Sequence, residues 1–131
     1  MNTQTAEKVT IRIAEATITL EPGERYAGPI LNVDGTTAHY LILLPGSANE
    51  IKWKDAIQWA ESIGGELPSR REQSLLYTNL KGEFEDDWYW SCEQYAGREF
   101  YAWFQHFGDG YQNYLHESSE LRARAVRRLT I

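Results

Sequence analysis

The clearest structural signal in this sequence is an apolar stripe near its middle. Apolar residues recur there at three- and four-residue spacing, at Trp53, Ala56, Ile57, Ala60 and Ile63. This spacing is typical of one face of an α-helix. Gly64-Gly65 follows, and glycine is common just past a helix end because it adopts the left-handed conformation. We therefore expect an amphipathic helix that packs its apolar face against another element.

A second helix is predicted to begin at Ser69. The run Ser69-Arg70-Arg71-Glu72 matches a capping box, in which serine and glutamate satisfy each other's free backbone amides. The buried side of this helix is expected to hold Leu75, Leu76 and Leu80. Lys81-Gly82 then ends the helix.

The residues before the helices favour β-structure. Val9–Ile13 alternates apolar and polar residues, as a half-buried strand does, and a second β-rich stretch, Ala16–Leu20, stops at the turn Glu21–Gly23. After a further turn at Val33–Thr36, His39–Leu44 is nearly continuous apolar. That composition is typical of a strand covered on both faces.

The chain returns to β-structure after the second helix. We expect strands at Trp88–Ser91, Phe100–Phe107, Tyr111–Glu117 and Leu121–Leu129, with a hairpin turn at Gly108-Asp109-Gly110. This order of elements predicts an α+β fold, with two helices and a small twisted antiparallel sheet in residues 49–131. An N-terminal β-rich segment at 9–48 and a flexible tail at 1–8 precede it. The length of 131 residues fits one globular unit.

The charge of the chain restricts its partners. With 19 acidic and 13 basic residues the net charge is −6, which argues against general nucleic-acid binding. A single cysteine, Cys92, forms no internal disulfide, so the fold does not depend on an oxidising compartment. No apolar run approaches the roughly 20 residues of a membrane span, and the N-terminus is polar. These features predict synthesis in the cytoplasm without membrane insertion, and leave association with a virion open.

Four motifs occur in order in the second half of the chain. They are Gly64–Glu72, Tyr89–Ser91, Tyr101–Gly110 and Leu121–Arg128. Together they resemble the Lcl C-terminal domain family, a domain of bacterial and phage proteins named for a bacterial collagen-like adhesin. The resemblance covers about residues 49–131 and implies a C-type-lectin-like fold in a phage or prophage protein. Such folds serve as sugar receptors, protein receptors, host-binding tips and occasionally enzymes, so the fold alone does not give the function.

The candidate ligand-binding residues lie on and around the predicted hairpin. They are Tyr101, Trp103, His106, Asp109, Tyr111, Asn113 and Tyr114. Rings supply contact area and amides supply adaptable hydrogen bonds, a mixture that suits a binding face. The alternative is that half of these side chains point into the core and the rest form a solvated face. We interpret the chain as a non-enzymatic recognition module for a protein or glycan of a host or bacterial surface.

Metal binding and catalysis are not predicted. His106, Asp109, His116 and Glu117 are possible donors near one hairpin, but calcium needs several clustered oxygens, and no Cys/His spacing suggests zinc. The Glu-Pro-Asn and Trp-Asn-Asp signatures of sugar-binding C-type lectins are absent. Cys92 is the only cysteine, whereas formylglycine-generating enzymes of this fold need a pair. A small buried residue fits the position of Cys92. We assign no cofactor, no metal and no catalytic residue.

Two further sets of residues have a structural and a functional interpretation. Arg122, Arg124 and Arg128 share one face of the predicted last strand, with Arg127 on the other unless a bulge intervenes. We expect them to pair with acidic residues rather than with an anionic ligand, and we expect Arg70-Arg71 to be structural. The candidate acids are Glu72, Glu83, Glu85, Asp86 and Asp87. On the first helix Trp53 belongs to the stripe, whereas Trp59 lies off it and is available to a partner.

Three other functions stay open at this point. A structural virion component, such as a tail or fibre piece, would dock its N-terminal strands into a larger assembly and form oligomers. An intracellular inhibitor would use the acidic surface to bind one host protein. An enzyme of the formylglycine-generating type is disfavoured by the lone cysteine.

Overall fold

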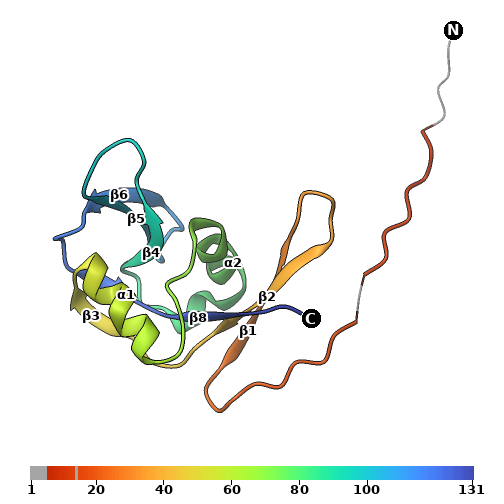
Figure 1. Ribbon diagram of the computed structural model, residues 1–131, viewed down its shortest axis with the longest axis horizontal. Helices are drawn as coiled ribbons and strands as arrows, with labels where there is room; N and C mark the ends of the chain where they lie inside the picture. The colour runs from red at the N-terminus through yellow and green to blue at the C-terminus, as the bar shows by residue number, and fades with distance from the viewer. Residues whose placement is uncertain (1–5, 14) are drawn as a thin grey trace, which may run out of the picture.

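The computed structural model describes residues 6–13 and 15–131. Within them it contains two α-helices, a short 3₁₀-helix and eight strands. The elements run β1 (Arg25–Leu31), β2 (Thr37–Leu43), β3 (Ala48–Ile51), α1 (Trp53–Ser62), α2 (Arg70–Leu80), a 3₁₀ turn (Lys81–Glu83), β4 (Trp88–Gln94), β5 (Tyr101–His106), β6 (Gln112–His116), β7 (Leu121–Ala123) and β8 (Val126–Leu129). The α+β class predicted from the sequence is confirmed (Figure 1).

The strands form two sheets, whereas the sequence predicted one small antiparallel sheet in residues 49–131 after an N-terminal β-rich segment. One sheet has the order β1-β2-β8 and is antiparallel, and the other has the order β3-β7-β4-β5-β6 with one parallel pair, β4 and β7. The predicted strand Leu121–Leu129 was wrong as one element, because it breaks at Arg124-Ala125 and joins both sheets. The buried Arg124 side chain donates to the Leu44 and Glu83 carbonyls at that break.

Both predicted helices are present. Ser69 caps α2, since its side chain accepts from the Glu72 amide at 3.1 Å while Glu72 accepts from the Ser69 amide at 2.8 Å. In α1 the indole of the buried Trp53 donates to the Ser91 carbonyl at 2.8 Å, which ties the helix to β4. The stripe ends earlier than predicted, because Ile63 lies past the helix end and is 41% exposed.

Two hydrophobic clusters fill the interior. The first lies between α1 and the five-stranded sheet and includes Trp90 and Phe104, which have at most 2% exposure. Trp59 packs against this cluster and is half-buried, so part of its ring stays exposed. The second cluster joins α2 to β2 around Leu41, Leu43 and Phe107. Leu41–Leu43 has no exposure, which confirms the strand that was expected to be covered on both faces.

The N-terminal region differs most from the prediction. Val9–Ile13 and Ala16–Leu20 were predicted as strands, but these residues form no strand and belong to neither sheet, so both predictions were wrong. The first five residues of the expected tail at 1–8 lie outside the described residues, and residues 6–8 are exposed coil. A strand that the sequence did not reveal, β1, follows the turn at Glu21–Gly23. Its Gly28-Pro29 pair obscures it, with a bulge and a positive φ of 131° at the glycine.

Candidate functional site

The structure divides the seven predicted binding residues between two places on the β5–β6 hairpin. Side chains alternate along a strand, so Tyr101 and Trp103 share one face of β5. Tyr114 lies opposite Trp103 in the register and joins that face. The remaining predicted residues lie at the turn or on the opposite face: His106, Asp109, Tyr111 and Asn113.

Four half-buried rings form a continuous surface, which we call the aromatic patch: Tyr95, Tyr101, Trp103 and Tyr114. Tyr95 and Tyr114 stack with ring centroids 3.8 Å apart, and Trp103 meets both edge-on at 5.5 Å. Tyr101 meets Tyr114 edge-on at 6.1 Å. The three edge-on contacts are the edge-to-face geometry that aromatic rings favour. The neighbouring hydroxyl of Tyr95 raises the pKa of Tyr114.

Tyr95 was not predicted as a site residue. It follows β4 and comes beside the hairpin because its amide donates to the Tyr101 carbonyl at 2.7 Å. The loop after it ends at Phe100, which is 53% exposed and holds a positive φ of 64°. A bulky residue in the left-handed region is strained, and such strain is concentrated at binding loops. The only sequence signal for this region was its aromatic content.

Two arginines lie over the rings of the patch. The guanidinium carbon of Arg70 is 3.5 Å from the centroid of a Trp103 ring, and that of Arg98 is 4.5 Å from the Tyr101 centroid. Guanidinium groups bind aromatic faces through the negative potential of the π-system. Trp103 and Tyr101 are two residues apart on one face of β5, so the two guanidinium groups lie along the same row of side chains. Arg70 was predicted to be structural, and its side chain lies in the site as well.

A chain of glutamines fixes Arg70 in this position. Gln112 Nε2 donates to the Arg70 carbonyl and to Gln105 Oε1, both at 2.7 Å, and Arg70 Nε donates to Gln112 Oε1 at 3.3 Å. Gln105 Nε2 in turn donates to the Gln73 carbonyl at 2.9 Å. Gln73 and Gln105 have no exposure, so the base of the patch is a buried polar network.

Most other arginines on the body are paired with carboxylates. The ion pairs are Arg25–Glu83, Arg122–Asp87, Arg127–Glu24 and Arg128–Glu72 with Glu66. The predicted pairing of the last-strand arginines with acids is therefore confirmed for Arg122 and Arg128. It was wrong for Arg124, whose side chain donates to the Leu44 and Glu83 backbone carbonyls instead. Arg127 pairs with Glu24, which was not among the predicted acids. By contrast, Arg70 and Arg98 form no ion pair within residues 6–13 and 15–131.

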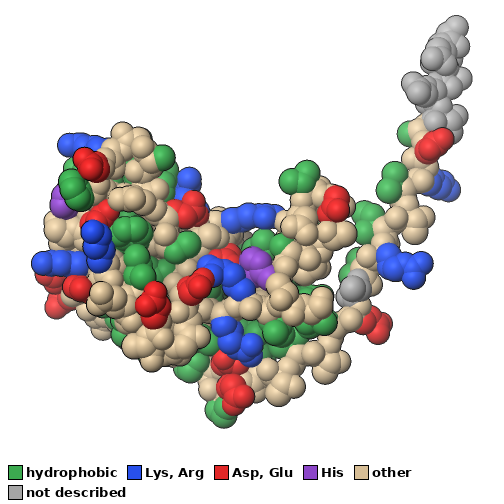
Figure 2. Space-filling model, in the orientation of Figure 1, with side chains coloured by type: hydrophobic (Ala, Val, Ile, Leu, Met, Phe, Trp, Pro, Cys, Tyr) green, Lys and Arg blue, Asp and Glu red, His purple; other side chains and the backbone are tan. Residues whose placement is uncertain are grey.

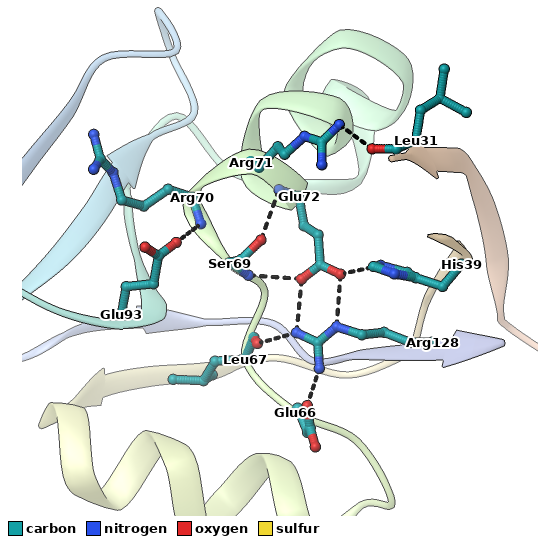
Figure 3. Close-up of polar contacts among 10 residues, drawn as sticks. All are labelled: Leu31, His39, Glu66, Leu67, Ser69, Arg70, Arg71, Glu72, Glu93 and Arg128. Atoms are coloured by element: carbon teal, nitrogen blue, oxygen red, sulfur yellow. Dashed lines mark hydrogen bonds and ion pairs between the residues drawn. The ribbon is translucent and has the colours of Figure 1, made fainter. Parts of the chain in front are cut away.

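The glutamate of the Ser69–Glu72 motif has a structural role of its own (Figure 3). Glu72 is 2% exposed, and Arg128 binds its two carboxylate oxygens at 2.7 and 2.8 Å. His39 Nε2 contacts the same carboxylate at 2.7 Å. We call Glu72, Arg128 and His39 the carboxylate clamp. It joins α2 to β8 and β2, so it holds the three-stranded sheet against the helix that supports the patch.

The side chains at the hairpin turn bind one another. Asp109 Oδ1 accepts from the Tyr111 amide at 3.0 Å and lies 3.2 Å from His106 Nδ1. The Tyr111 amide, helped by His106, holds the pKa of Asp109 below its usual range. The Asn113 amide donates to the Tyr111 hydroxyl. These four predicted residues therefore shape the turn, and the structure does not bring them onto the aromatic patch.

The possible metal donors are not gathered in one place. No group of three or more His, Cys, Asp and Glu side chains that could hold a metal ion occurs in the described part of the chain. His116 Nδ1 instead contacts Ser118 Oγ at 2.7 Å, and the buried Glu117 accepts from Gln94 at 2.9 Å.

Cys92 is exposed, so the prediction of a buried cysteine was wrong. Its side chain falls at the irregular part of the β4–β5 register, where the strand does not cover it. Desolvation of the thiol by its neighbours, together with Glu72 and Glu93, raises its pKa to about 11. The thiol therefore stays protonated near neutral pH, and the thiolate is the form that acts as a nucleophile.

No protein-family model matches the chain, and no curated protein matches it. Among the described residues, no helix is long and apolar enough to cross a membrane.

Proposed function

We propose that this protein is a non-enzymatic recognition module that binds a protein or glycan through the aromatic patch. The observation that carries the proposal is the pair Arg70 and Arg98, whose guanidinium groups lie over half-exposed rings without a carboxylate partner in the described chain. On a protein of net charge −6, these two guanidinium groups are available to bind a ligand. Their free N–H groups suit a ligand rich in acceptor oxygens.

The fixed geometry of the patch supports this function. Tyr95 stacks on Tyr114, and the glutamine chain places Arg70 over Trp103, so these side chains are ordered before any ligand arrives. Ordering side chains costs about 0.5–1.5 kcal/mol each at an interface. A preorganised patch avoids that cost, and Trp, Tyr and Arg are the residue types that dominate binding energies.

The proposal extends to the fold and the source of the protein. The two helices and the mixed sheets are compatible with the C-type-lectin-like fold that the motif order implies, and a phage or prophage gene agrees with that resemblance. We infer synthesis in the bacterial cytoplasm and a ligand on a host or bacterial surface. The raised pKa of Cys92 argues against this thiol as a nucleophile.

Capture from a bacterial lysate and from purified envelope tests the proposal. The wild type, Trp103→Ala and Arg98→Ala are compared with Tyr26→Ala, which removes a 41% exposed ring on β1, away from the patch. We expect the wild type and Tyr26→Ala to retain one species, and the patch variants to retain at least about tenfold less. Equal retention of the captured species by all four proteins would contradict the assignment of the binding site to the aromatic patch.

One observation favours a second function, that of a structural virion component. The N-terminal segment exposes alternating apolar side chains that pack on little else, as an arm that docks into an assembly would. Co-purification with virion proteins in place of a surface ligand would support that function. Capture of a single cytoplasmic host protein would support an inhibitor instead.

A further inference from the structure

The two arginines of the aromatic patch keep most of their hydrogen-bond donors free. A guanidinium group presents its N–H donors around the edge of a plane. Arg70 donates Nε–H to Gln112 Oε1 at 3.3 Å, and its terminal nitrogens have no partner in the described part of the chain. The guanidinium of Arg98 lies on the Tyr101 ring and makes no ion pair among the described residues. These donors are therefore open to a ligand.

The rings place the two guanidinium groups in a row. Arg70 lies 3.5 Å from the Trp103 centroid and Arg98 lies 4.5 Å from the Tyr101 centroid, so a ring covers one face of each group. Water is excluded from a covered face, and this strengthens the attraction of the cation for an anion. Trp103 and Tyr101 are two residues apart on β5, so their side chains leave the sheet about 7 Å apart.

The carboxylates that neighbour these arginines do not pair with them. Glu93 Oε2 accepts from the backbone amide of Arg70 at 2.7 Å, and Glu72 is held in the carboxylate clamp. Figure 3 shows the Arg70 side chain leading away from Glu72. Glu99, which follows Arg98 in the chain, forms no ion pair among the described residues. A carboxylate from another molecule can therefore occupy the open side of each guanidinium.

The rest of the surface disfavours a polyanion as the ligand. The net charge is −6, and the other arginines in ion pairs have acidic partners. Figure 2 shows acidic and basic side chains interspersed over the face in view, without a continuous basic surface among the described residues. A polyanion gains its affinity by having many charges neutralised at once. Two isolated cations fit two separate carboxylates better.

We propose that the ligand of the aromatic patch is an extended protein segment that carries two carboxylates, from Asp or Glu, with one residue between them. In an extended segment, side chains two residues apart lie on one face about 7 Å apart, which matches the rings under Arg70 and Arg98. Each carboxylate accepts from the fork of one guanidinium. This inference rests on the proposed function of the patch and names its ligand class.

Peptide titration followed by NMR tests both the charge and the spacing of this ligand. The probe is Ac-Glu-Thr-Glu-NH2, and the signals are the Nε–H groups of the arginines and the indole N–H of Trp103 in the full chain. Ac-Glu-Glu-Thr-NH2 has the same composition with adjacent carboxylates, and Ac-Gln-Thr-Gln-NH2 keeps the spacing without the charge. We expect the probe to bind about threefold or more tighter than the first control and about tenfold tighter than the second.

Glutamine substitutions assign the contacts. Arg70→Gln and Arg98→Gln should each weaken binding of Ac-Glu-Thr-Glu-NH2 about fivefold or more, and remove its advantage over Ac-Glu-Glu-Thr-NH2, because one fork is left. Arg98 is exposed on a loop, so its replacement leaves the fold intact. Arg71→Gln is the matched control, since its guanidinium binds the Leu31 carbonyl at 2.6 Å, away from the patch. That variant removes the same charge and should change the affinity less than twofold.

The outcomes separate this inference from the proposed function. Equal binding of the three peptides, lost in Trp103→Ala, would overturn the acidic ligand and leave recognition by the patch standing. Binding of none of them at millimolar concentration would overturn the inference, while capture of an envelope species still tests the function. Tight binding of dextran sulfate with a steep salt dependence that Arg70→Gln reduces would show a polyanionic glycan and overturn the protein ligand.

Discussion

The aromatic patch and the N-terminal segment both expose large apolar side chains, but only one of them is packed. In the patch, Tyr95 and Tyr114 stack at 3.8 Å and Arg70 lies 3.5 Å from the Trp103 ring. In the N-terminal segment, Val9, Ile11 and Ile13 stay at least 72% exposed, without strand pairing. The first surface is packed by the fold itself, whereas the second stays exposed to solvent.

This difference in packing bears on which surface is suited to bind a ligand. A preorganised patch has already lost its side-chain freedom, so it binds without a further ordering cost and can be selective. We therefore propose the patch, and not the N-terminal segment, as the ligand-binding surface.

The largest expected effect comes from breaking the framework that supports the patch. Glu72→Ala leaves Arg128 without its buried partner, and removing one member of a buried ion pair costs about 3–5 kcal/mol of unfolding free energy. Urea denaturation measures this loss. Arg25→Ala is the control, since its pair with Glu83 is exposed and is worth at most about 1 kcal/mol. Equal losses in both variants would show that the clamp does not hold the fold.

A smaller effect on the unfolding free energy is expected when one side chain is removed from each of the two surfaces. Trp103→Ala removes a ring that packs on Tyr95, Tyr114 and Arg70, and we expect about 2 kcal/mol lower unfolding free energy because the ring is half-buried. Ile11→Ala removes a side chain that packs on little, so we expect a change within about 0.5 kcal/mol. Denaturant midpoints at low protein concentration measure both. A destabilised Ile11→Ala monomer would mean that the segment packs on its own body.

The smallest effect is the pH dependence of the N-terminal anchor. Hydrogen bonds from Arg127 lower the pKa of Glu24 from its ordinary value of 4.5. The folded state therefore favours the carboxylate, and this contribution is present above pH 4.5 and lost as the pH falls through the lower folded pKa. We expect Glu24→Gln to be less stable than the wild type near pH 7 and the two proteins to converge in acid. A difference that persists below both pKa values would show that Glu24 stabilises the fold by packing alone.

The sequence predicted the elements whose signals are local. The apolar spacing from Trp53 to Ala60 and the Ser69–Glu72 capping box were enough to predict both helices, because these interactions occur within one element. The hairpin at Gly108–Gly110 was predicted for the same reason. The alternation of apolar and polar residues predicted a strand at Val9–Ile13 wrongly, since a strand needs a neighbouring strand as well as a pattern.

The site was predicted only in part, because its geometry depends on distant segments. Tyr101, Trp103 and Tyr114 were among the predicted residues, and strand register brings them together. Tyr95 and Arg98 come from the loop between β4 and β5, and Arg70 comes from the start of α2. No spacing in the sequence indicates that these residues meet the hairpin face.

Titration of the captured ligand against Trp103→Ala and Ile11→Asp is the most direct test of the division between the two surfaces. We expect Trp103→Ala to bind about 30-fold or more weakly, the effect of losing about 2 kcal/mol of binding free energy at a central aromatic residue. Ile11→Asp should bind the ligand as the wild type does. Unchanged affinity of Trp103→Ala, or loss of ligand binding by Ile11→Asp, would contradict the account.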